Sequence, residues 1–278
     1  MSKIEWCDVT INPIVGCSKI SEGCTGCYAE KMAYRLMRMG IPKYQGVVNK
    51  NGWTGKIGID LGVFHKTPFK SKKIFVVSMG DLFNENVGID EMDAVFRGMR
   101  EYPWHTYILL TKRPQRMAIA VEGWFEGGNK KMPNVWLGVT AENQKRADER
   151  IPILLQIPAA VRFVSVEPML EPVNLGWGEN GHRGLKVLKI AEGAVFRCGL
   201  SKQVLAPIKD AGKWIRWDAA GEHYPEISWV ICGPETGPKA RPCKPEWIED
   251  LYEQCKVAGV PFFDKRKNGW LAREYPKT

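Results

Sequence analysis

The sequence predicts an α/β protein built on a parallel β-sheet, and two observations carry this prediction. Short, continuous apolar runs recur along the chain, as expected for strands buried on both faces, and amphipathic segments with helical spacing separate them. Between residues 73 and 162 the runs start about thirty residues apart, the length of one βαβ repeat. Such repeats predict crossover connections and a parallel sheet, either open or curled into a barrel.

Six strands are expected from the apolar runs. They are "KIFVVSM" at 73–79, "HTYILLT" at 105–111, "NVWLGVT" at 134–140, "RFVSVEP" at 162–168, "SWVICG" at 228–233 and "VPFFDK" at 260–265. An additional first strand fits within "CDVTINPIVG" at 7–16.

Three helices stand out between the strands, at 28–40, 90–102 and 245–259. The last begins with Pro245 in its first turn and closes at Gly259, the usual asymmetry of helix ends. Its apolar stripe includes Cys255, which we expect to be a small buried hydrophobic residue.

Residues 1–278 are expected to form a single domain that carries an insertion at 175–226, before the last two strands. The insertion is rich in glycine and charge, and so long a connection is expected to carry small elements of its own.

The composition indicates a soluble, cytoplasmic protein. The N-terminus lacks the apolar core of a signal peptide, and no apolar run is long enough to span a membrane. In a reducing compartment, clustered cysteines bind metal more often than they form disulfides. The net charge of +9 favours polyanionic partners such as nucleic acid. Eleven tryptophans could stack on bases, but their positions in strands and helices favour core packing.

Polar residues gather where the predicted strands end. In α/β sheets and barrels, ligands bind at the carboxyl ends of the strands. The sequence places Ser78-Met79-Gly80-Asp81 after the first secure strand. The other strands end in Thr111-Lys112-Arg113, Glu142, Ser165 with Glu167, Gly233, and Asp264-Lys265-Arg266. Six such ends on one rim predict a binding site.

Three cysteines precede this rim, in "GCSKISEGCTGCYAEKMAYR" at 16–35. Cys17 and Cys24 have six residues between them, and Cys24 and Cys27 have two. A structural zinc site needs four ligands, and the nearest other candidates, Cys7 and His65, stand at no familiar spacing. Three thiolates match a [4Fe–4S] cluster that leaves one iron open to another ligand.

The chain resembles a known family at this point. The motifs "NPIVGCSKISEGCTGCYAE", "SMGDLF", "LLTKRP", "VWLGVTAENQ", "RFVSVEPML", "ICGPETGPKARP" and "VPFFDKR" occur in the same order in phage-type three-cysteine proteins, which are described as radical S-adenosylmethionine proteins of bacteriophages and prophages. The resemblance covers the chain apart from the insertion. It implies a partial (β/α) barrel of the radical SAM type, open on one side to a large substrate.

The resemblance also implies the cofactors and their ligands. Cys17, Cys24 and Cys27 would bind a [4Fe–4S] cluster, and its open iron would bind S-adenosylmethionine, which reductive cleavage converts to a 5′-deoxyadenosyl radical. Two departures are visible. The first two cysteines are more widely spaced than the three residues of the commonest radical enzymes, and Gly26 stands where those enzymes place an aromatic residue, with Tyr28 following instead.

Other positions are assigned by the same resemblance. Asp81, in the segment Ser78, Met79, Gly80 and Asp81, would accept the amino group of the cofactor, although it could instead cap the following turn. Lys112 or Arg113 would hold the carboxylate of the cofactor or a substrate phosphate. Ser165 and Glu167 would bind the ribose, although Glu167 could position the substrate or serve structure alone. Tyr28, Thr111, Glu142 and Gly233 complete the expected cofactor site.

Two residues are candidates for catalysis, Glu167 and Cys232. Cys232 could donate a hydrogen atom, as a cysteine does in the related lyases that repair thymine photoproducts, but burial in a strand also explains it.

The expected function is radical modification of a nucleic acid base, first of all in phage DNA, within the host cytoplasm and with flavodoxin or ferredoxin as electron donor. A second hypothesis keeps the cofactors but takes RNA, a free nucleotide or a peptide as substrate. A third is a zinc-stabilised nucleic-acid-binding protein without catalysis. Basic residues of the insertion, at positions 183, 186, 189, 202, 209, 213 and 216, are expected to contact phosphates together with Lys112 and Arg113.

Overall fold

Seven parallel strands form the central sheet of the computed structural model, which describes residues 4–126, 128, 132–175, 227–266 and 271–276. In sheet order, which is also chain order, the strands are β1 (Val9–Ile11), β6 (Lys73–Val76), β7 (Thr106–Thr111), β8 (Val135–Thr140), β9 (Val161–Val166), β10 (Trp229–Cys232) and β11 (Phe262–Asp264). All six apolar runs and the additional first strand are therefore confirmed.

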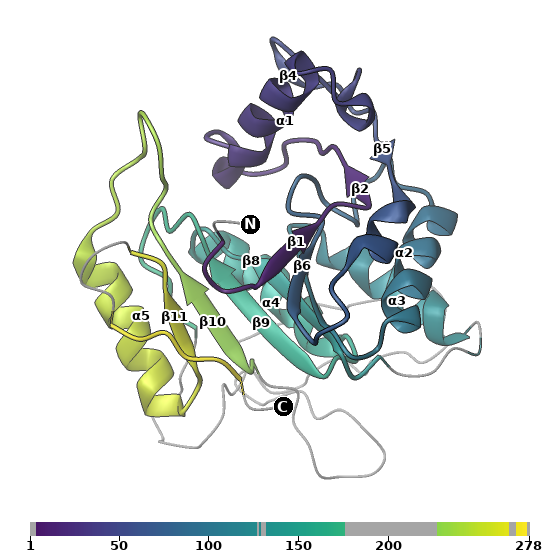
Figure 1. Ribbon diagram of the computed structural model, residues 1–278. Coiled ribbons are helices and arrows are strands. Elements are labelled where there is room, and N and C mark those ends of the chain that lie inside the picture. The colour runs from purple at the N-terminus through teal and green to yellow at the C-terminus, as the bar shows by residue number, and fades with distance from the viewer. Residues whose placement is uncertain (1–3, 127, 129–131, 176–226, 267–270, 277–278) are drawn as a thin grey trace, which may run out of the picture.

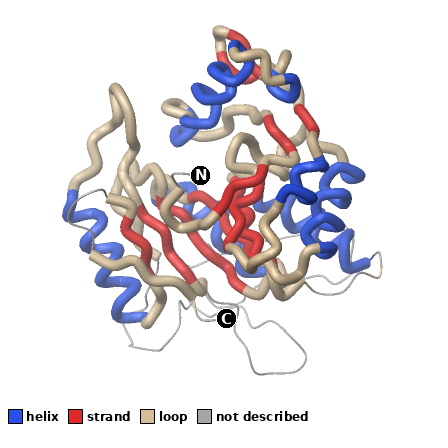
Figure 2. The backbone as a smooth tube through the Cα atoms, in the orientation of Figure 1, coloured by secondary structure: helices blue, strands red, loops and turns tan. Residues whose placement is uncertain are grey.

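The sheet curls through 195° into a half-barrel, so the predicted α/β partial barrel is confirmed. Figures 1 and 2 show the strands side by side with the helices arranged outside the curve. Every strand is parallel to its neighbours, and therefore all the carboxyl ends lie on one rim.

Four helices cover the outer face of the half-barrel (Figure 1). They are α2 (Ile89–Glu101), α3 (Pro114–Glu126), α4 (Gln144–Gln156) and α5 (Pro245–Ala258). Their apolar stripes pack with alternate strand residues in one large core cluster, which contains Val76, Leu109, Val139 and Val164. The expected ends of α5 are confirmed, because Pro245 opens it and Gly259 closes it in a left-handed conformation at φ 69°. Cys255 on α5 is fully buried, as predicted.

A second core cluster fills the inner face of the half-barrel and consists mainly of aromatic side chains. Trp136, Phe163 and Trp229 pack there with Trp6, Phe75 and Phe263. A side chain at Gly138 would collide with the ring of Phe163, so this glycine provides the room for the ring. These tryptophans serve the core, as the sequence favoured.

Between β1 and β6 the chain forms a separate layer above the rim. Helix α1 (Tyr28–Arg38) packs there with η2 (Pro42–Tyr44), β3 (Val48–Asn49) and β4 (Gly52–Trp53) in a third core cluster. The remaining short elements are β2 (Ile14–Val15), which pairs with β5 (Gly58–Ile59), η1 (Glu22–Cys24) and η3 (Leu61–Lys66). Figure 1 shows α1 above the end of β1 and away from the outer helices.

The predicted insertion falls almost entirely on residues 176–226, outside the described part of the chain, between β9 and β10. Its basic residues, expected to contact phosphates, lie there too. Within the described residues, no helix combines the length and the apolar character needed to cross a membrane.

Candidate functional site

The three cysteines lie on the loop that leaves β1 and enters α1, at the carboxyl end of the half-barrel. None forms a disulfide, and each side chain is half-buried. Cys27 is the N-cap of α1, where its sulfur accepts a hydrogen bond from the backbone N–H of Glu30 at 3.5 Å. We call residues 16–27 the cysteine loop.

The cysteine loop starts on the end of β6. Gly16 donates its N–H to the carbonyl of Met79 at 3.1 Å and forms a β-bridge with Gly80. A Cβ at Gly80 would lie 2.6 Å from the carbonyl oxygen of Gly16, so the two backbones approach as only glycine allows. Asn12 accepts hydrogen bonds from the hydroxyl of Ser78 and the N–H of Met79. The backbone of the 78–81 segment therefore supports the cysteine loop.

Arg113 holds the next part of the loop from beneath. Its guanidinium donates to Glu85, to Asp81, to the sulfur of Cys17 at 3.8 Å, and to both the carbonyl and the hydroxyl of Ser18. These bonds use all five donors of the guanidinium. The cofactor-carboxylate role left open between Lys112 and Arg113 therefore does not fit Arg113, because no donor remains.

Asp81 is buried and faces inward. Its carboxylate accepts hydrogen bonds from the hydroxyl of Thr111 at 2.7 Å and from the N–H of Phe83 at 3.0 Å, and it pairs with Arg113 at 2.9 Å. The bond to Phe83 is the turn cap that the sequence allowed as an alternative. Asp81 and Thr111 thus orient Arg113 and, through it, the cysteine loop.

Glu142 contacts the loop from the end of β8. Its fully buried carboxylate accepts hydrogen bonds from the hydroxyl of Ser21 and from the N–H of Gly23 at 3.3 Å, and it pairs with Arg150 at 2.8 Å. Burial would raise the pKa of Glu142, but the positive charges of Lys112 and Arg150 outweigh it and the pKa is lowered. Glu142 is therefore an anion that holds the loop next to Cys24.

The loop between β10 and α5 contacts the same segment from the other side. Glu235 forms a bidentate pair with Arg241, and Arg241 donates to the carbonyl of Glu22 at 2.9 Å. The side chain of Glu235 lies against Gly26, where a Cβ would collide with the carboxylate oxygen. This close approach explains why glycine stands immediately before Cys27.

The thiols share one electrostatic environment. Burial raises the pKa of Cys17 to about 12, with further contributions from Asp81 and Cys27 that the charge of Arg113 opposes. Burial also raises the pKa of Cys27, and Cys24 adds to this shift. Cys17 interacts with Cys27, and Cys27 with Cys24, so the three thiols lie near one another.

Within the described part of the chain, neither Cys7 nor His65 joins them as a fourth ligand. Cys7 precedes β1 and packs beside the inner aromatic cluster at the opposite end of the strand, and His65 shares a 2.7 Å hydrogen bond with Tyr102. Among the described residues, no three side chains of histidine, cysteine, aspartate or glutamate gather around a position for one metal ion. Three thiols are one ligand short of a closed zinc site, whereas they are the number that would hold a [4Fe–4S] cluster with one open iron.

Several predicted residues keep polar groups available near the rim. Ser165 is buried, and its hydroxyl has no hydrogen-bond partner among the described residues. By strand register it pairs with Thr140 and with Ile231, a member of the inner cluster, and therefore lies on the inner face. The ammonium of Lys112 makes no ion pair in the described part of the chain. The side chain of Tyr28 is 62% exposed at the start of α1.

Glu167 and Gly233 lie at the rim in contact with the end of β11. The carboxylate of Glu167 pairs with the ammonium of Lys265, and a Cβ at Gly233 would lie 2.9 Å from the Cβ of Lys265. Glu167 is therefore a partly exposed, charge-balanced group beside the inner face.

Cys232 lies on the wrong face for a hydrogen-atom donor. Ile231 belongs to the inner cluster, and the next residue, Cys232, therefore points to the outer face, where it is fully buried in the large core and contacts the sulfur of Met169 at 3.7 Å. Packing between the sheet and α5 accounts for this residue.

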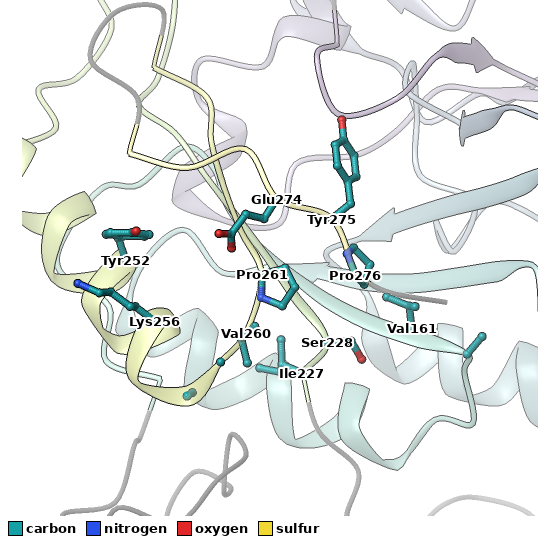
Figure 3. Close-up of a pocket in the computed structure, with 13 residues that line it drawn as sticks. Val161, Ile227, Ser228, Tyr252, Lys256, Val260, Pro261, Glu274, Tyr275 and Pro276 are labelled. Atoms are coloured by element: carbon teal, nitrogen blue, oxygen red, sulfur yellow. The ribbon is translucent and has the colours of Figure 1, made fainter.

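A cavity of about 940 Å³ opens at the other end of the half-barrel (Figure 3). Val161, Ser228, Tyr252, Lys256 and Glu274 are among its lining residues. This is the amino-terminal end of β9, β10 and β11, whereas (β/α) barrels carry their active sites at the carboxyl end. It also borders Ile227, which follows the undescribed residues 176–226. We assign the functional site to the cysteine loop.

Sequence reasoning missed most of the side chains that support the loop. Ser18, Ser21, Glu85 and Arg241 were not singled out, although Arg241 falls within the motif "GPETGPKARP", and Glu235 was expected only as one of the polar residues that follow its strand. The one signal in the sequence that could have found them is the number of charged residues that follow each strand. In the structure, several of these residues contact the cysteine loop.

Comparison with known proteins gives one match. The model of a family described as "Protein of unknown function (DUF5131)" matches residues 1–278. No curated protein and no solved structure matches the chain.

Proposed function

The chain belongs to the DUF5131 family, which has no assigned function, and we propose from its site that it is a radical S-adenosylmethionine enzyme. The observation that carries the proposal is the position of Cys17, Cys24 and Cys27 on one loop after the first strand of a parallel half-barrel. At the carboxyl end of such a barrel, three thiolates would hold a [4Fe–4S] cluster and leave one iron for S-adenosylmethionine.

The rest of the site supports this assignment. Contacts from the ends of β6, β7, β8 and β10 hold the loop, so the thiols are fixed before any metal binds. Arg113 supplies a positive charge at Cys17, which favours the thiolate. When bound, the cluster supplies the electron that cleaves the sulfonium of S-adenosylmethionine and starts radical chemistry.

The residues still available at the rim suggest how the cofactor is oriented. Lys112 would hold its carboxylate by a charge-assisted hydrogen bond. Ser165 would place its partnerless hydroxyl against the ribose, which explains why a buried hydroxyl lacks a partner within the described residues. Tyr28 would contact the adenine, and Glu167 with Lys265 would border the substrate side.

We further propose that the substrate is a nucleic acid base, in DNA first of all, and that a flavodoxin or ferredoxin supplies the electron. The support for a nucleic acid is the net charge of +9 and the half-barrel itself, whose sheet closes through only 195° and leaves one side without strands.

The test is anaerobic reconstitution with iron and sulfide, followed by reductant and S-adenosylmethionine. We expect about four irons per chain and release of 5′-deoxyadenosine, both lost in Cys24→Ala. Protein that retains zinc but no iron would overturn the proposal. Mass analysis of nucleosides from treated DNA and RNA, with peptide and free-nucleotide arms, then identifies the substrate class.

A further inference from the structure

The exposed side of α1 carries a row of positive charges. Lys31, Arg35 and Arg38 are all exposed, and their spacing of four and three residues places them on one side of the helix. Tyr28, 62% exposed, begins the same row one turn earlier. We call Lys31, Arg35 and Arg38 the α1 stripe.

The stripe is not balanced by acidic partners. Among the described residues none of its three side chains forms an ion pair, and Glu30, the one acidic residue of α1, pairs instead with Lys19 at 2.9 Å. Like charges at these spacings cost an isolated helix a few tenths of a kcal/mol per pair. Residues 28–56 contain six basic residues and one acidic residue, a net of +5 out of +9 for the chain.

From Lys31 to Arg38, the stripe leads away from the proposed cluster. Cys27 is the N-cap of its helix, so Lys31 lies about one turn from a proposed cluster ligand. Lys31 is also close enough to Glu235 to contribute to the lowered pKa of that carboxyl, whose main cause is the hydrogen bond from Arg241. Glu235 also lies against Gly26, so the stripe begins near the loop between β10 and α5, which carries exposed Lys239 and Lys244.

We infer that the α1 stripe binds the phosphate backbone of a nucleic acid strand and guides one of its bases to the site beside Cys27. Seven residues of helix span about 10 Å, which matches about three nucleotides of a stacked strand at the 3.4 Å rise of a duplex. The inference rests on the proposed function for the reaction at that site, but the binding surface itself does not depend on a cluster.

The packing of α1 argues against a membrane as the partner. An interfacial helix needs a free apolar face to enter the lipid. The apolar side of α1 packs instead in the third core cluster with Val15, Val47 and Met79. Apart from Tyr28 and Met39 at its two ends, the exposed side of α1 is charged or polar, as expected for a surface that binds phosphates in water.

The test compares two triple variants with equal charge change. In one, Lys31, Arg35 and Arg38 are replaced by Gln. In the other, Lys66, Lys70 and Lys256 are replaced by Gln; the first two precede β6 and the third lines the cavity at the amino end of the sheet. Binding to labelled single-stranded DNA, duplex DNA and single-stranded RNA is measured across a salt series, with circular dichroism to confirm folding.

We expect the stripe variant to lose about tenfold or more in affinity at moderate salt, and the slope of log K against log salt to fall by about 2 for single strands, since each phosphate contact contributes about 0.7. The control should keep the wild-type slope. Equal slopes in the two variants, or binding of anionic vesicles in place of all three nucleic acids, would overturn the inference. Iron and sulfide content, measured in parallel, reports separately on the proposed function.

Discussion

The guanidinium of Arg113 lies between the sulfur of Cys17, 3.8 Å from one nitrogen, and the carboxylate of Asp81, 2.9 Å from the same nitrogen. Hydrogen bonds to the sulfurs of an iron–sulfur site help to set its reduction potential. Asp81 fixes the position of Arg113 but also offsets its charge. A buried carboxylate thus acts on the first proposed cluster ligand through an arginine.

Asp81→Asn should destabilise the protein far more than Glu85→Gln. Both carboxylates pair with Arg113, but the side chain of Asp81 is 6% exposed and that of Glu85 is 50% exposed. Removing one partner of a buried pair costs about 3 kcal/mol, whereas an exposed pair is worth about 1 kcal/mol or less. Urea unfolding of the metal-free protein measures both. Equal losses would mean that Arg113 does not depend on its buried partner.

Replacing any one of Cys17, Cys24 or Cys27 by Ala should abolish the cluster, with loss of the brown colour and of bound iron and sulfide. Cys255→Ala is the matched control, because this cysteine is fully buried on the core-facing side of α5. It should keep the cluster while losing about 1 kcal/mol of stability from the lost packing. A full iron content in any of the three loop variants would remove that cysteine from the ligand set.

Lys112→Met should weaken S-adenosylmethionine binding by about tenfold or more, since a hydrogen bond to a charged group is worth about 1.5–3 kcal/mol. The cluster should remain, because Arg150 still pairs with Glu142 once the charge of Lys112 is removed. Lys145→Met, an exposed lysine on α4, is the control and should bind normally. Calorimetric titration measures both affinities, and an unchanged affinity in Lys112→Met would move the carboxylate contact elsewhere.

Ser165→Ala should have opposite effects on stability and on binding. The buried hydroxyl has no partner among the described residues, so its removal should stabilise the metal-free protein by about 1 kcal/mol. It should weaken cofactor binding, because the proposed ribose contact is lost. Thermal unfolding and calorimetry separate the two effects. A destabilised variant with normal binding would identify Ser165 as a structural residue only.

Gly26→Ala should disturb the contact between the cysteine loop and Glu235. The added Cβ would collide with the Glu235 carboxylate, so the loop between β10 and α5 should show faster hydrogen exchange and the cluster should be lost more readily. Gly123→Ala is the control, since its Cβ meets nothing within 4 Å in α3. It should gain up to about 1 kcal/mol from helix propensity. Normal exchange in Gly26→Ala would show that the loop can shift at little cost.

The strands and the position of the cysteines could be predicted from the sequence. Each strand is a continuous apolar run, and parallel order puts whatever follows a strand on one rim. Cys17 therefore had to lie at the carboxyl end once β1 was placed. The directions of the strand side chains could not be predicted. In "SWVIC" every residue is apolar or small, so alternation could not show that Ile231 faces inward and Cys232 outward.

The contacts that hold the cysteine loop could not be predicted from the sequence either. Gly23 meets Glu142 across 119 residues, and adjacent positions such as Lys112 and Arg113 turned out to have different surroundings. A charged residue after a strand can face a ligand or a neighbouring loop, and only the three-dimensional arrangement distinguishes them.

The bond from Arg241 to the carbonyl of Glu22 joins positions 219 residues apart. During synthesis the thiols emerge before all of these contacts, and Arg241 is the last of the residues described here that hold their loop. Contacts this distant in sequence form late in folding. The cysteine loop can therefore reach its final shape only after Arg241 has been synthesised, and loading of the proposed cluster would follow that point.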